Sequence, residues 1–303
     1  MRIVVFGAGS LGTAIGALLA RKNEVVLVGR PRNVSAIRER GVRVVGDIDL
    51  RVEVEARASI DGIAPPELLI VSTKSYDTAA AIEECRDWVG KDTKVLTLQN
   101  GLGNLELLRD WRAERAFGGT TTLGANLLEP GKVRLSGLGK TVIGSDLDQV
   151  GAKRIAEAFS AGGMPASVAE DVLKETWAKA VVSSCVNPLT AILRVPNGSL
   201  LESPATSRML SEVCRECVDV ANAHGIRLSH ISMIKRVRTV ARDTRSNRSS
   251  MLQDVERGKR TEIAYINGAI VRHGLARNVK TPLNLTLLAM VESLERQGPA
   301  EKG

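Results

Sequence analysis

The sequence is poor in aromatic residues and has no long apolar run. Phe, Trp and Tyr together make up 3% of the 303 residues, so the hydrophobic core must consist mainly of Val, Ile, Leu and Ala. Few aromatic side chains are therefore available to stack on nucleic-acid bases. No stretch approaches the roughly 18 consecutive apolar residues that a membrane-spanning helix requires. These shortages count against a nucleic-acid-binding protein and against a membrane protein.

The sequence also begins without the charged, apolar and small-residue zones of a signal peptide. Residues 1–12, MRIVVFGAGSLG, pass directly from a strand pattern into a glycine turn. We therefore expect the fold to begin at residue 1 and the protein to be cytoplasmic.

Cysteine is scarce as well, with four residues at positions 85, 185, 214 and 217. The pair Cys214-x-x-Cys217 lies in a helical pattern, and no second pair at a familiar spacing supplies the other two ligands of a zinc site. We expect no metal site, and we expect buried free thiols.

Positive charge is in surplus, with a formal net charge of +8. Lys and Arg are spread along the chain, and their densest run, Lys235 to Arg248, is typical of a solvated helix face and loop. An electropositive cleft for a phosphorylated cofactor and an anionic substrate explains the surplus without nucleic acid.

The length of the chain and its pattern predict two domains. Short runs rich in Val and Ile alternate with helical spacing in the first half, as in a βαβ series with a mostly parallel sheet. The expected strands are 3–6, 25–28, 42–45, 52–54, 68–72 and 95–98, and two further strands, 132–135 and 141–144, are expected to extend the same sheet in antiparallel fashion. From about residue 171 only helical patterns follow. We predict an α/β domain over 1–167 and an all-α domain over 168–303, with residues 298–303 frayed.

The glycine turn predicts a Rossmann-type cofactor site. Gly7-Ala8-Gly9-Ser10-Leu11-Gly12 is a G-x-G-x-x-G motif that follows a strand and opens a helix. In this setting Gly7 permits the tight turn, Gly9 lets the backbone approach a pyrophosphate, and Gly12 allows close packing of helix on strand. The N-terminus of the helix then favours the phosphates.

The end of the second strand indicates which nicotinamide cofactor binds. An NAD enzyme places Asp or Glu there, whereas this chain has Val28-Gly29-Arg30-Pro31-Arg32. Arg30 can bind a 2′-phosphate and stack on the adenine, so NADPH is favoured and NADH stays open. Arg32 is either a second contact or a surface charge. Lys74 and Asn100 follow later strands, where ligands usually bind, but a loop lysine and a turn asparagine are equally compatible with the sequence.

The first long helix of the second half carries polar residues on one face. Lys179, Ser183 and Asn187 are spaced i, i+4 and i+8 among Ala, Val and Cys, so they share one side of the helix. We expect this face to border a cleft.

At this point the sequence resembles the ketopantoate reductases (2-dehydropantoate 2-reductases) of pantothenate and coenzyme A biosynthesis. The resemblance spans nearly the whole chain in the family's order. It is carried by GAGSLG, Lys74, Gln99-Asn100-Gly101, the stretch from Lys179 to Asn187-Pro-Leu-Thr-Ala-Ile, Ser249-Ser250-Met-Leu-Gln-Asp254, and Thr261-Glu262-Ile-Ala-Tyr-Ile-Asn267-Gly268. It implies NADPH-dependent reduction of ketopantoate and a C-terminal domain like that of 6-phosphogluconate dehydrogenase.

The resemblance also implies roles for single residues. Lys179 is expected to be the general acid, with Glu262 as its catalytic partner, and Glu262 and Asn187 are expected to hold the substrate. Ser250 and Asn100 are expected to complete the pocket, and Lys74 to assist cofactor or substrate binding. Ser183 is also expected to contact the substrate, although the family often has Asn at this position and the serine side chain is shorter. A homodimer and feedback by coenzyme A are further expectations.

The residues themselves agree with this chemistry. Hydride delivery to a ketone leaves an alkoxide, which needs a proton donor, and an apolar cleft would lower the lysine pKa toward neutrality. Ser250-Met-Leu-Gln253 has the form of a capping box, so Ser250 is expected to begin a helix whose N-terminus could receive the substrate carboxylate. Thr261 is expected to cap the next helix, with Glu262 in its first turn. His224, His230 and His273 show no catalytic partner arrangement, and we expect them to be structural or exposed.

Two alternatives remain open. Another NAD(P)-dependent hydroxyacid dehydrogenase would share the glycine turn and a helix-borne lysine, although such enzymes typically resemble K-x-x-N-N there and this chain has Lys179-Ala-Val-Val-Ser183. A noncatalytic NADP-sensing regulator would have no need of Lys179, Asn187, Ser250 and Glu262 together.

Overall fold

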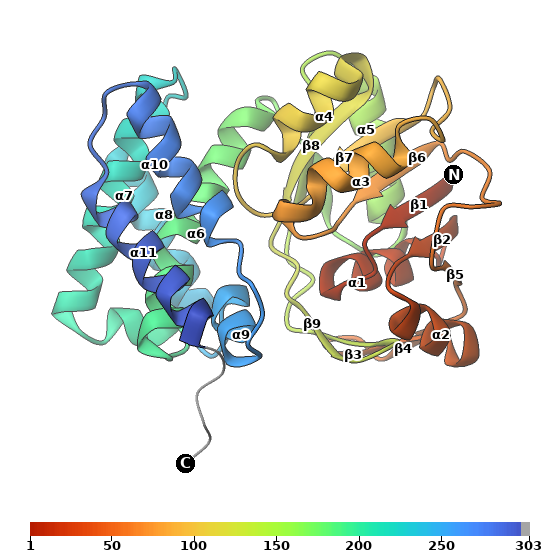
Figure 1. Ribbon diagram of the computed structural model, residues 1–303, viewed down its shortest axis with the longest axis horizontal. Coiled ribbons are helices and arrows are strands. Elements are labelled where there is room, and N and C mark those ends of the chain that lie inside the picture. The colour runs from red at the N-terminus through yellow and green to blue at the C-terminus, as the bar shows by residue number, and fades with distance from the viewer. Residues whose placement is uncertain (298–303) are drawn as a thin grey trace. The chain divides into compact units, whose positions relative to one another are not determined.

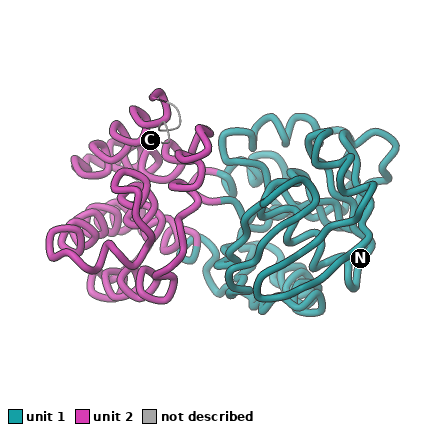
Figure 2. The backbone as a smooth tube through the Cα atoms, turned by 90° about the horizontal axis from the view of Figure 1, so that it is seen from below, with its two compact units in different colours: residues 1–99, 104–175 teal, residues 100–103, 176–303 magenta. Residues whose placement is uncertain are grey.

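The computed structural model describes residues 1–297, and the segment expected to fray, 298–303, lies outside this range. The chain divides into two compact units: unit 1 comprises residues 1–99 and 104–175, and unit 2 comprises residues 100–103 and 176–303 (Figure 2). The expected boundary at residue 167 differs from this division because Val172 and Leu173, in the first turn of helix α6, pack in the core of unit 1. No helix among residues 1–297 is long and apolar enough to cross a membrane.

Unit 1 is built on an eight-stranded sheet of order β12-β11-β8-β7-β6-β1-β2-β5. All neighbouring pairs are parallel except β8 and β11. The strands are β1 (Arg2–Phe6), β2 (Glu24–Val28), β5 (Glu55–Arg57), β6 (Leu68–Val71), β7 (Lys94–Thr97), β8 (Ala116–Thr121), β11 (Thr141–Gly144) and β12 (Ala166–Val168).

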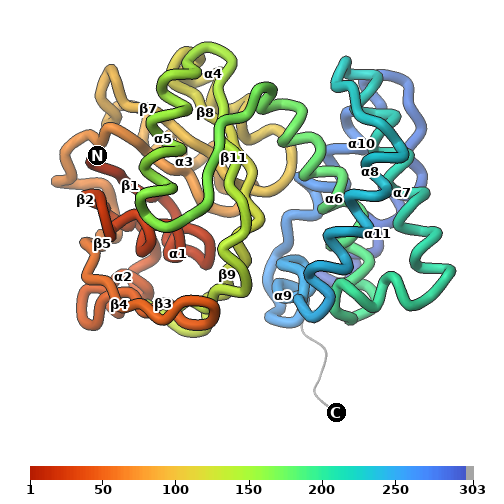
Figure 3. The backbone as a smooth tube through the Cα atoms, turned by 180° about the vertical axis from the view of Figure 1, so that it is seen from behind, coloured from red at the N-terminus to blue at the C-terminus, as the bar shows by residue number. Residues whose placement is uncertain are grey.

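Alternate residues of the central strands point to opposite faces of this sheet, and each face is covered by helices. Ile3 and Val5 of β1 join the core formed with α1, α2 and α5, whereas Val4 and Phe6 join the core formed with α3 and α4 (Figures 1 and 3). The helices are α1 (Ser10–Leu19), α2 (Pro31–Arg40), α3 (Thr78–Cys85), α4 (Asn104–Arg112) and α5 (Gln149–Ala161). The predicted α/β class with a mostly parallel sheet is confirmed.

Three of the predicted strands lie in a second, four-stranded sheet of order β4-β3-β10-β9, so their expected placement in the main sheet was wrong. Its strands are β3 (Val42–Gly46), β4 (Leu50–Val52), β9 (Ala125–Glu129) and β10 (Lys132–Leu135). Residues 42–45, 52–54 and 132–135 were expected in the main sheet, whereas β3, β4 and β10 lie in the small one. Their burial alternates, as in a sheet with one solvated face. The antiparallel placement of β11, against β8, is correct.

Unit 2 is helical in every element described up to residue 297, as the sequence predicts. Its elements are α6 (Val172–Leu193), η3 (Asn197–Leu201), α7 (Pro204–Ala223), α8 (His230–Asp243), α9 (Ser250–Glu256), η4 (Ile263–Tyr265), α10 (Asn267–Ala276) and α11 (Pro282–Gln297), where η denotes a 3₁₀ helix. Helix α6, whose first turn belongs to unit 1, contributes Val181, Cys185 and Leu189 to the main core of unit 2 and Ala191 to a second core with α9 and α11. Four buried free thiols, Cys85, Cys185, Cys214 and Cys217, agree with the sequence.

Candidate active site

The turn between β1 and α1 shows why each glycine of the motif is needed. Gly7 has φ +112°, and a Cβ there would lie 2.5 Å from the Thr73 backbone nitrogen. A Cβ at Gly12 would lie 2.1 Å from the Gly7 carbonyl oxygen, whereas a Cβ at Gly9 would meet nothing within 4 Å. Glycine at 7 and 12 thus allows close backbone contacts, of Gly7 with Ser72 and Thr73 and of Gly12 with Gly7. Gly9 faces open space.

Two side chains that the sequence did not single out hold this turn. The Ser72 hydroxyl donates to the Gly7 carbonyl at 3.0 Å. The buried Asn33 amide donates to the Ala8 carbonyl at 2.7 Å and accepts from the Gly131 N–H at 2.8 Å. The carbonyls of the turn are therefore occupied within unit 1, and the first N–H groups of α1 have no partner inside their own helix. The only sequence signal for this role of Asn33 was its position shortly after β2, close to the glycine turn.

The turn fits the pyrophosphate of a dinucleotide. Gly9 is the N-cap of α1 and brings no side-chain oxygen to the N–H groups behind it, so an anion can take that position. The Ser10 hydroxyl accepts from the Leu127 N–H at 3.1 Å, which keeps that side chain on the protein. Residues 7–12, including Leu11, are therefore suited to bind the cofactor phosphates.

A Gly9→Val variant separates ligand binding from folding. The backbone at Gly9 has φ −83°, which valine tolerates, and the open space beside it predicts a Tm close to that of the parent. The isopropyl group would occupy the space over the helix terminus, so we expect the NADPH Kd to rise at least about tenfold. Gly12→Val is the contrast, because its clash with Gly7 should lower the Tm itself. A stable Gly9→Val protein with parental NADPH affinity would remove this turn from the cofactor site.

The end of β2 carries the arginines that the sequence predicts. Arg30 is exposed and serves as the N-cap residue of α2, with the extended backbone of φ −62° and ψ 143°. Arg32, also exposed, lies in the first turn of the same helix. No carboxylate follows β2 in this turn, so a 2′-phosphate would meet positive charge there.

Gln99 links the loops that follow β6 and β7. Its side-chain nitrogen donates to the Thr73 carbonyl and the Thr78 hydroxyl, both at 2.8 Å, and its oxygen accepts from the Thr97 hydroxyl at 2.9 Å. The half-buried Lys74 follows directly after Thr73, so Gln99 fixes the backbone from which Lys74 projects. The sequence singled out the motif around Gln99 without assigning this role.

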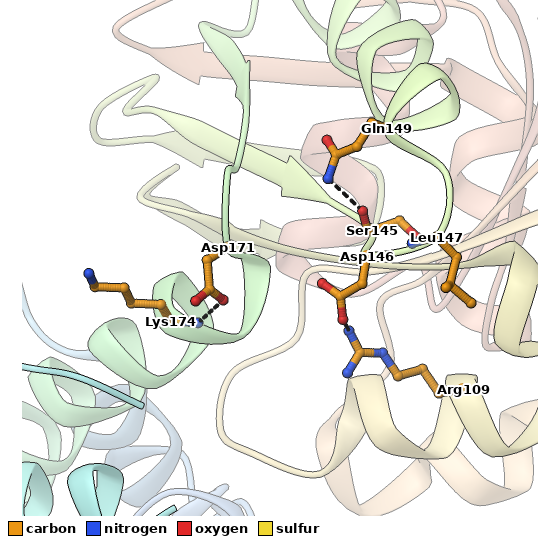
Figure 4. Close-up of polar contacts among 7 residues, drawn as sticks. All are labelled: Arg109, Ser145, Asp146, Leu147, Gln149, Asp171 and Lys174. Atoms are coloured by element: carbon orange, nitrogen blue, oxygen red, sulfur yellow. Dashed lines mark hydrogen bonds and ion pairs between the residues drawn. The ribbon is translucent and has the colours of Figure 1, made fainter. Parts of the chain in front are cut away.

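The helix that carries Lys179 begins at a side-chain cap. Asp171 accepts from the Lys174 backbone N–H at 2.9 Å, in the first turn of α6 (Figure 4). The same view shows the ion pair between Arg109 of α4 and Asp146, after β11. The start of α6 is therefore fixed by its own acidic N-cap.

The expected polar face of α6 is present. Lys179, Ser183 and Asn187 are partly exposed, whereas the intervening Val181 and Cys185 are fully buried. The i, i+4, i+8 spacing thus places the three polar side chains along one accessible side of the helix, next to fully buried residues.

Glu262 lies beside this face within unit 2, 5% exposed. Its backbone is held by Thr261, whose N–H donates to Glu295 at 2.7 Å and whose hydroxyl accepts from the Ile263 N–H at 3.1 Å. The Asn100 side-chain nitrogen lies 3.4 Å from a Glu262 carboxylate oxygen. Glu262 therefore precedes the 3₁₀ helix η4 as its N-cap residue, whereas the sequence placed it inside the first turn of a helix.

The Lys179 ammonium is tuned by these surroundings. Burial lowers the pKa of Lys179 from its ordinary value of 10.5 to about 8, and the charge of Glu262 opposes part of that decrease. A lysine with this pKa is protonated at neutral pH and can still release its proton, as a general acid must.

Asn100 reaches Glu262 because its loop packs on η4. Gly101 has φ +84°, and a Cβ there would lie 2.3 Å from the Tyr265 carbonyl oxygen. The Leu102 N–H donates to the same carbonyl at 2.9 Å, and Leu102 is 2% exposed in the core of unit 2. Glycine at 101 is thus required for the approach that brings Asn100 to the carboxylate.

Helix α9 begins at Ser250, as predicted, but the capping side chain is that of the preceding residue. Ser249 is the N-cap of α9: its hydroxyl accepts from the Leu252 N–H at 3.1 Å and from the Thr190 hydroxyl at 2.7 Å. Two adjacent serines made the choice ambiguous in the sequence. Ser250 is the exposed first residue of the helix, so its hydroxyl is not used for the cap.

The histidines make packing contacts or lie at the surface, in agreement with the expectation that they are structural or exposed. His224 and His273 form an aromatic cluster with Trp177, and His224 Nε2 lies 3.1 Å from the His273 carbonyl oxygen. His230 lies 2.7 Å from Asp219. Within residues 1–297, no three His, Cys, Asp or Glu side chains are grouped so as to hold a metal ion.

An α/β unit with a glycine turn of the Rossmann type and a helical unit with a titratable lysine beside a buried carboxylate are typical of a dinucleotide-dependent oxidoreductase. Comparison with known proteins is consistent with this class. The family model "Ketopantoate reductase PanE/ApbA" matches residues 3–147, and the model of its C-terminal part matches residues 171–295. The chain belongs to the ketopantoate reductase family.

Relatives and solved structures match along the full length. A 2-dehydropantoate 2-reductase of Pyrococcus horikoshii is 40% identical, covering 100% of both chains, and that of Halobacterium salinarum is 39% identical, covering 98% of this chain and 100% of the relative. The structure of a ketopantoate reductase family protein of Ralstonia eutropha has a TM-score of 0.90 at 32% identity, covering 98% of this chain and 99% of that one. A D-mandelate dehydrogenase solved with NADH and anilino(oxo)acetate has a TM-score of 0.93 at 28% identity, with the same coverage.

Proposed function

We propose that the protein reduces ketopantoate (2-dehydropantoate) to pantoate with NADPH. The observation that carries the proposal is the grouping of Lys179, Glu262 and Asn100 in unit 2, in a chain that belongs to the ketopantoate reductase family over its full length. Unit 1 would bind the cofactor and unit 2 the keto acid.

The reaction needs one proton and one hydride. NADPH, when bound, would supply the hydride, and the carbonyl oxygen of the keto acid would gain negative charge. The Lys179 ammonium would donate its proton to that oxygen, which yields the hydroxyl of the product and a neutral amine. Its pKa of about 8 leaves most of the lysine protonated at pH 7.

Glu262 and Asn100 would select the substrate. Ketopantoate carries a hydroxyl on the far side of its keto group, and a buried carboxylate is a strong acceptor for such a hydroxyl. A keto acid without that hydroxyl would leave Glu262 without this donor, at a cost in affinity. The site therefore favours a hydroxylated 2-keto acid.

The proposal is tested by following NADPH oxidation with a panel of 2-keto acids. We expect ketopantoate to give the highest kcat/KM. The panel includes the aryl keto acid that corresponds to mandelate, because the likeness to D-mandelate dehydrogenase favours a 2-hydroxyacid dehydrogenase as the second candidate. Turnover of the aryl acid alone would replace the first proposal by the second, and no turnover with any keto acid would point to a noncatalytic binding protein.

Cofactor choice is expected to depend on Arg30. We expect Arg30→Ala to raise the Kd of NADPH about tenfold while that of NADH stays the same, because the guanidinium would pair with the 2′-phosphate alone. The matched control is Arg40→Ala, which removes an exposed arginine from the last turn of the same helix. Equal losses for both cofactors would contradict the assignment, and equal losses in both variants would indicate a general effect of charge.

The other roles stay predictions. Asn187 and Ser183 would contact the substrate from α6, Ser250 would bind its carboxylate, and Lys74 would bind a cofactor or substrate anion. The homodimer, feedback by coenzyme A and the cytoplasmic location likewise rest on the sequence.

A further inference from the structure

Helix α6 contains a proline that leaves one of its carbonyls without its usual donor. Pro188 lies inside the helix, and proline has no N–H. In a regular α-helix the N–H of residue 188 would donate to the carbonyl of Ser184. Ser184 is fully buried, so this carbonyl needs another donor from the protein.

Asn267 provides that donor. Its side-chain nitrogen donates to the Ser184 carbonyl at 3.0 Å, and Asn267 is itself fully buried. Ser184 lies five residues after Lys179, and Asn267 lies five residues after Glu262. One hydrogen bond therefore joins the two segments that carry the candidate proton donor and its carboxylate.

The orientation of the Asn267 amide is fixed by a chain of partners. The Glu216 carboxylate, which only accepts, receives the Asn284 side-chain N–H at 2.8 Å and the Leu283 and Asn284 backbone N–H groups at 2.9 and 3.0 Å. The Asn284 oxygen must then face the other way, where it accepts from Asn267 at 3.0 Å. Asn267 consequently presents nitrogen, and not oxygen, to the Ser184 carbonyl.

We infer that Asn267 is a positioning residue for the active site: by occupying the carbonyl that Pro188 releases, it sets the placement of Lys179 relative to Glu262. The inference rests on the proposed function for its kinetic consequence. It also has a consequence without substrate, because the charge of Glu262 supports the protonated form of Lys179 only while the two groups are held close together.

The test uses Asn267→Leu, which keeps the bulk and removes the donor. We expect kcat for ketopantoate to fall on the order of tenfold, since small displacements of reacting groups are costly. The pKa of Lys179 should fall below its parental value, because the support from Glu262 weakens. That pKa is measured without substrate by NMR on protein whose lysines carry 13C-methyl groups, with the Lys179 signal assigned by its loss in Lys179→Arg.

A second variant, Pro188→Ala, distinguishes a role of Asn267 in positioning Lys179 from a role in stability alone. Pro188→Ala restores the N–H of residue 188, which can satisfy the Ser184 carbonyl within the helix. In the Pro188→Ala protein, Asn267→Leu should lower the Tm much less than it does in the parent. The double variant can therefore be assayed even if Asn267→Leu alone does not fold. The effects of Asn267→Leu on kcat and on the Lys179 pKa should persist, because the link between the two segments is still missing.

The matched control is Asn197→Leu. Asn197 is also a buried asparagine of unit 2, and its side-chain nitrogen donates to the Thr244 hydroxyl at 2.8 Å. This variant should lose stability and keep the Lys179 pKa. Recovery of both kcat and the pKa together with the Tm in the Pro188→Ala background would overturn the inference. If the parent protein does not reduce ketopantoate, the proposed function fails, and the pKa measurement still decides the role of Asn267.

Discussion

Lys179→Ala is expected to lower kcat for ketopantoate reduction by a factor on the order of 10² or more while the NADPH Kd barely changes. The reason is that alanine leaves the developing alkoxide without its proton donor, whereas the glycine turn that would bind the cofactor lies in unit 1. Single-turnover measurement with saturating ketopantoate gives the rate of the chemical step directly.

Lys174→Ala is the matched control, because Lys174 is an exposed lysine at the start of the same helix. It should turn over like the parent. Parental turnover in Lys179→Ala would exclude Lys179 as the general acid, and equal losses in the two variants would indicate a defect of the helix instead of its chemistry.

Glu262→Gln is expected to change the pH profile as well as the rate. With Lys179 as the proposed general acid, reduction needs its protonated form, so the parental rate should fall as the pH rises through about 8. The charge of Glu262 raises the pKa of Lys179, and glutamine removes that contribution, so the alkaline limb should move to lower pH. KM for ketopantoate should rise about tenfold or more, because an amide is a weaker acceptor than a carboxylate.

The diagnostic feature is the direction of this shift. A limb that stays in place while KM rises would mean that Glu262 binds substrate without acting on Lys179. A limb that moves to higher pH would contradict the assignment of this limb to Lys179. Asn100→Ala provides the comparison, since it removes a neighbour of Glu262 without changing charge and should raise KM with little effect on the limb.

The sequence predicted what depends on local spacing. The shared face of Lys179, Ser183 and Asn187 follows from helical geometry alone, and so does the placement of the glycine turn after a strand. The approach of Asn100 to Glu262, 162 residues apart, could not follow from spacing, because it depends on how the 100–103 loop packs on Tyr265. Only the family resemblance named both residues.

The sheet to which a strand belongs could not be predicted where it depends on the pairing partner and not on the strand's own residue pattern. Residues 42–45 have the same Val-rich pattern as the central strands, yet β3 pairs with β10 in the second sheet. Conversely, β5 takes the edge of the main sheet with the sequence Glu55-Ala-Arg57, which shows no apolar run. An edge strand needs little hydrophobicity, so pattern reading passes over it.

The proline in helix α6 is a sequence signal for a buried donor such as Asn267. A proline inside a predicted helix implies an orphaned carbonyl four residues earlier, which in turn implies a buried donor elsewhere in the chain. Pro188 and Asn267 both lie in the motifs that carry the family resemblance. The sequence does not show that Asn267 donates to the carbonyl that Pro188 leaves without a donor.

The short excursion of residues 100–103 has a practical consequence for anyone dissecting this enzyme. Because the polypeptide passes from unit 1 to unit 2 at residue 99, returns at 103 and leaves again at 175, no single scission yields both halves intact. A fragment beginning at residue 176 would lack Asn100 and would have a vacancy where Leu102 fills its interior. A chimera in which a foreign domain replaces unit 1 must therefore retain native residues 100–103, inserted into the foreign domain.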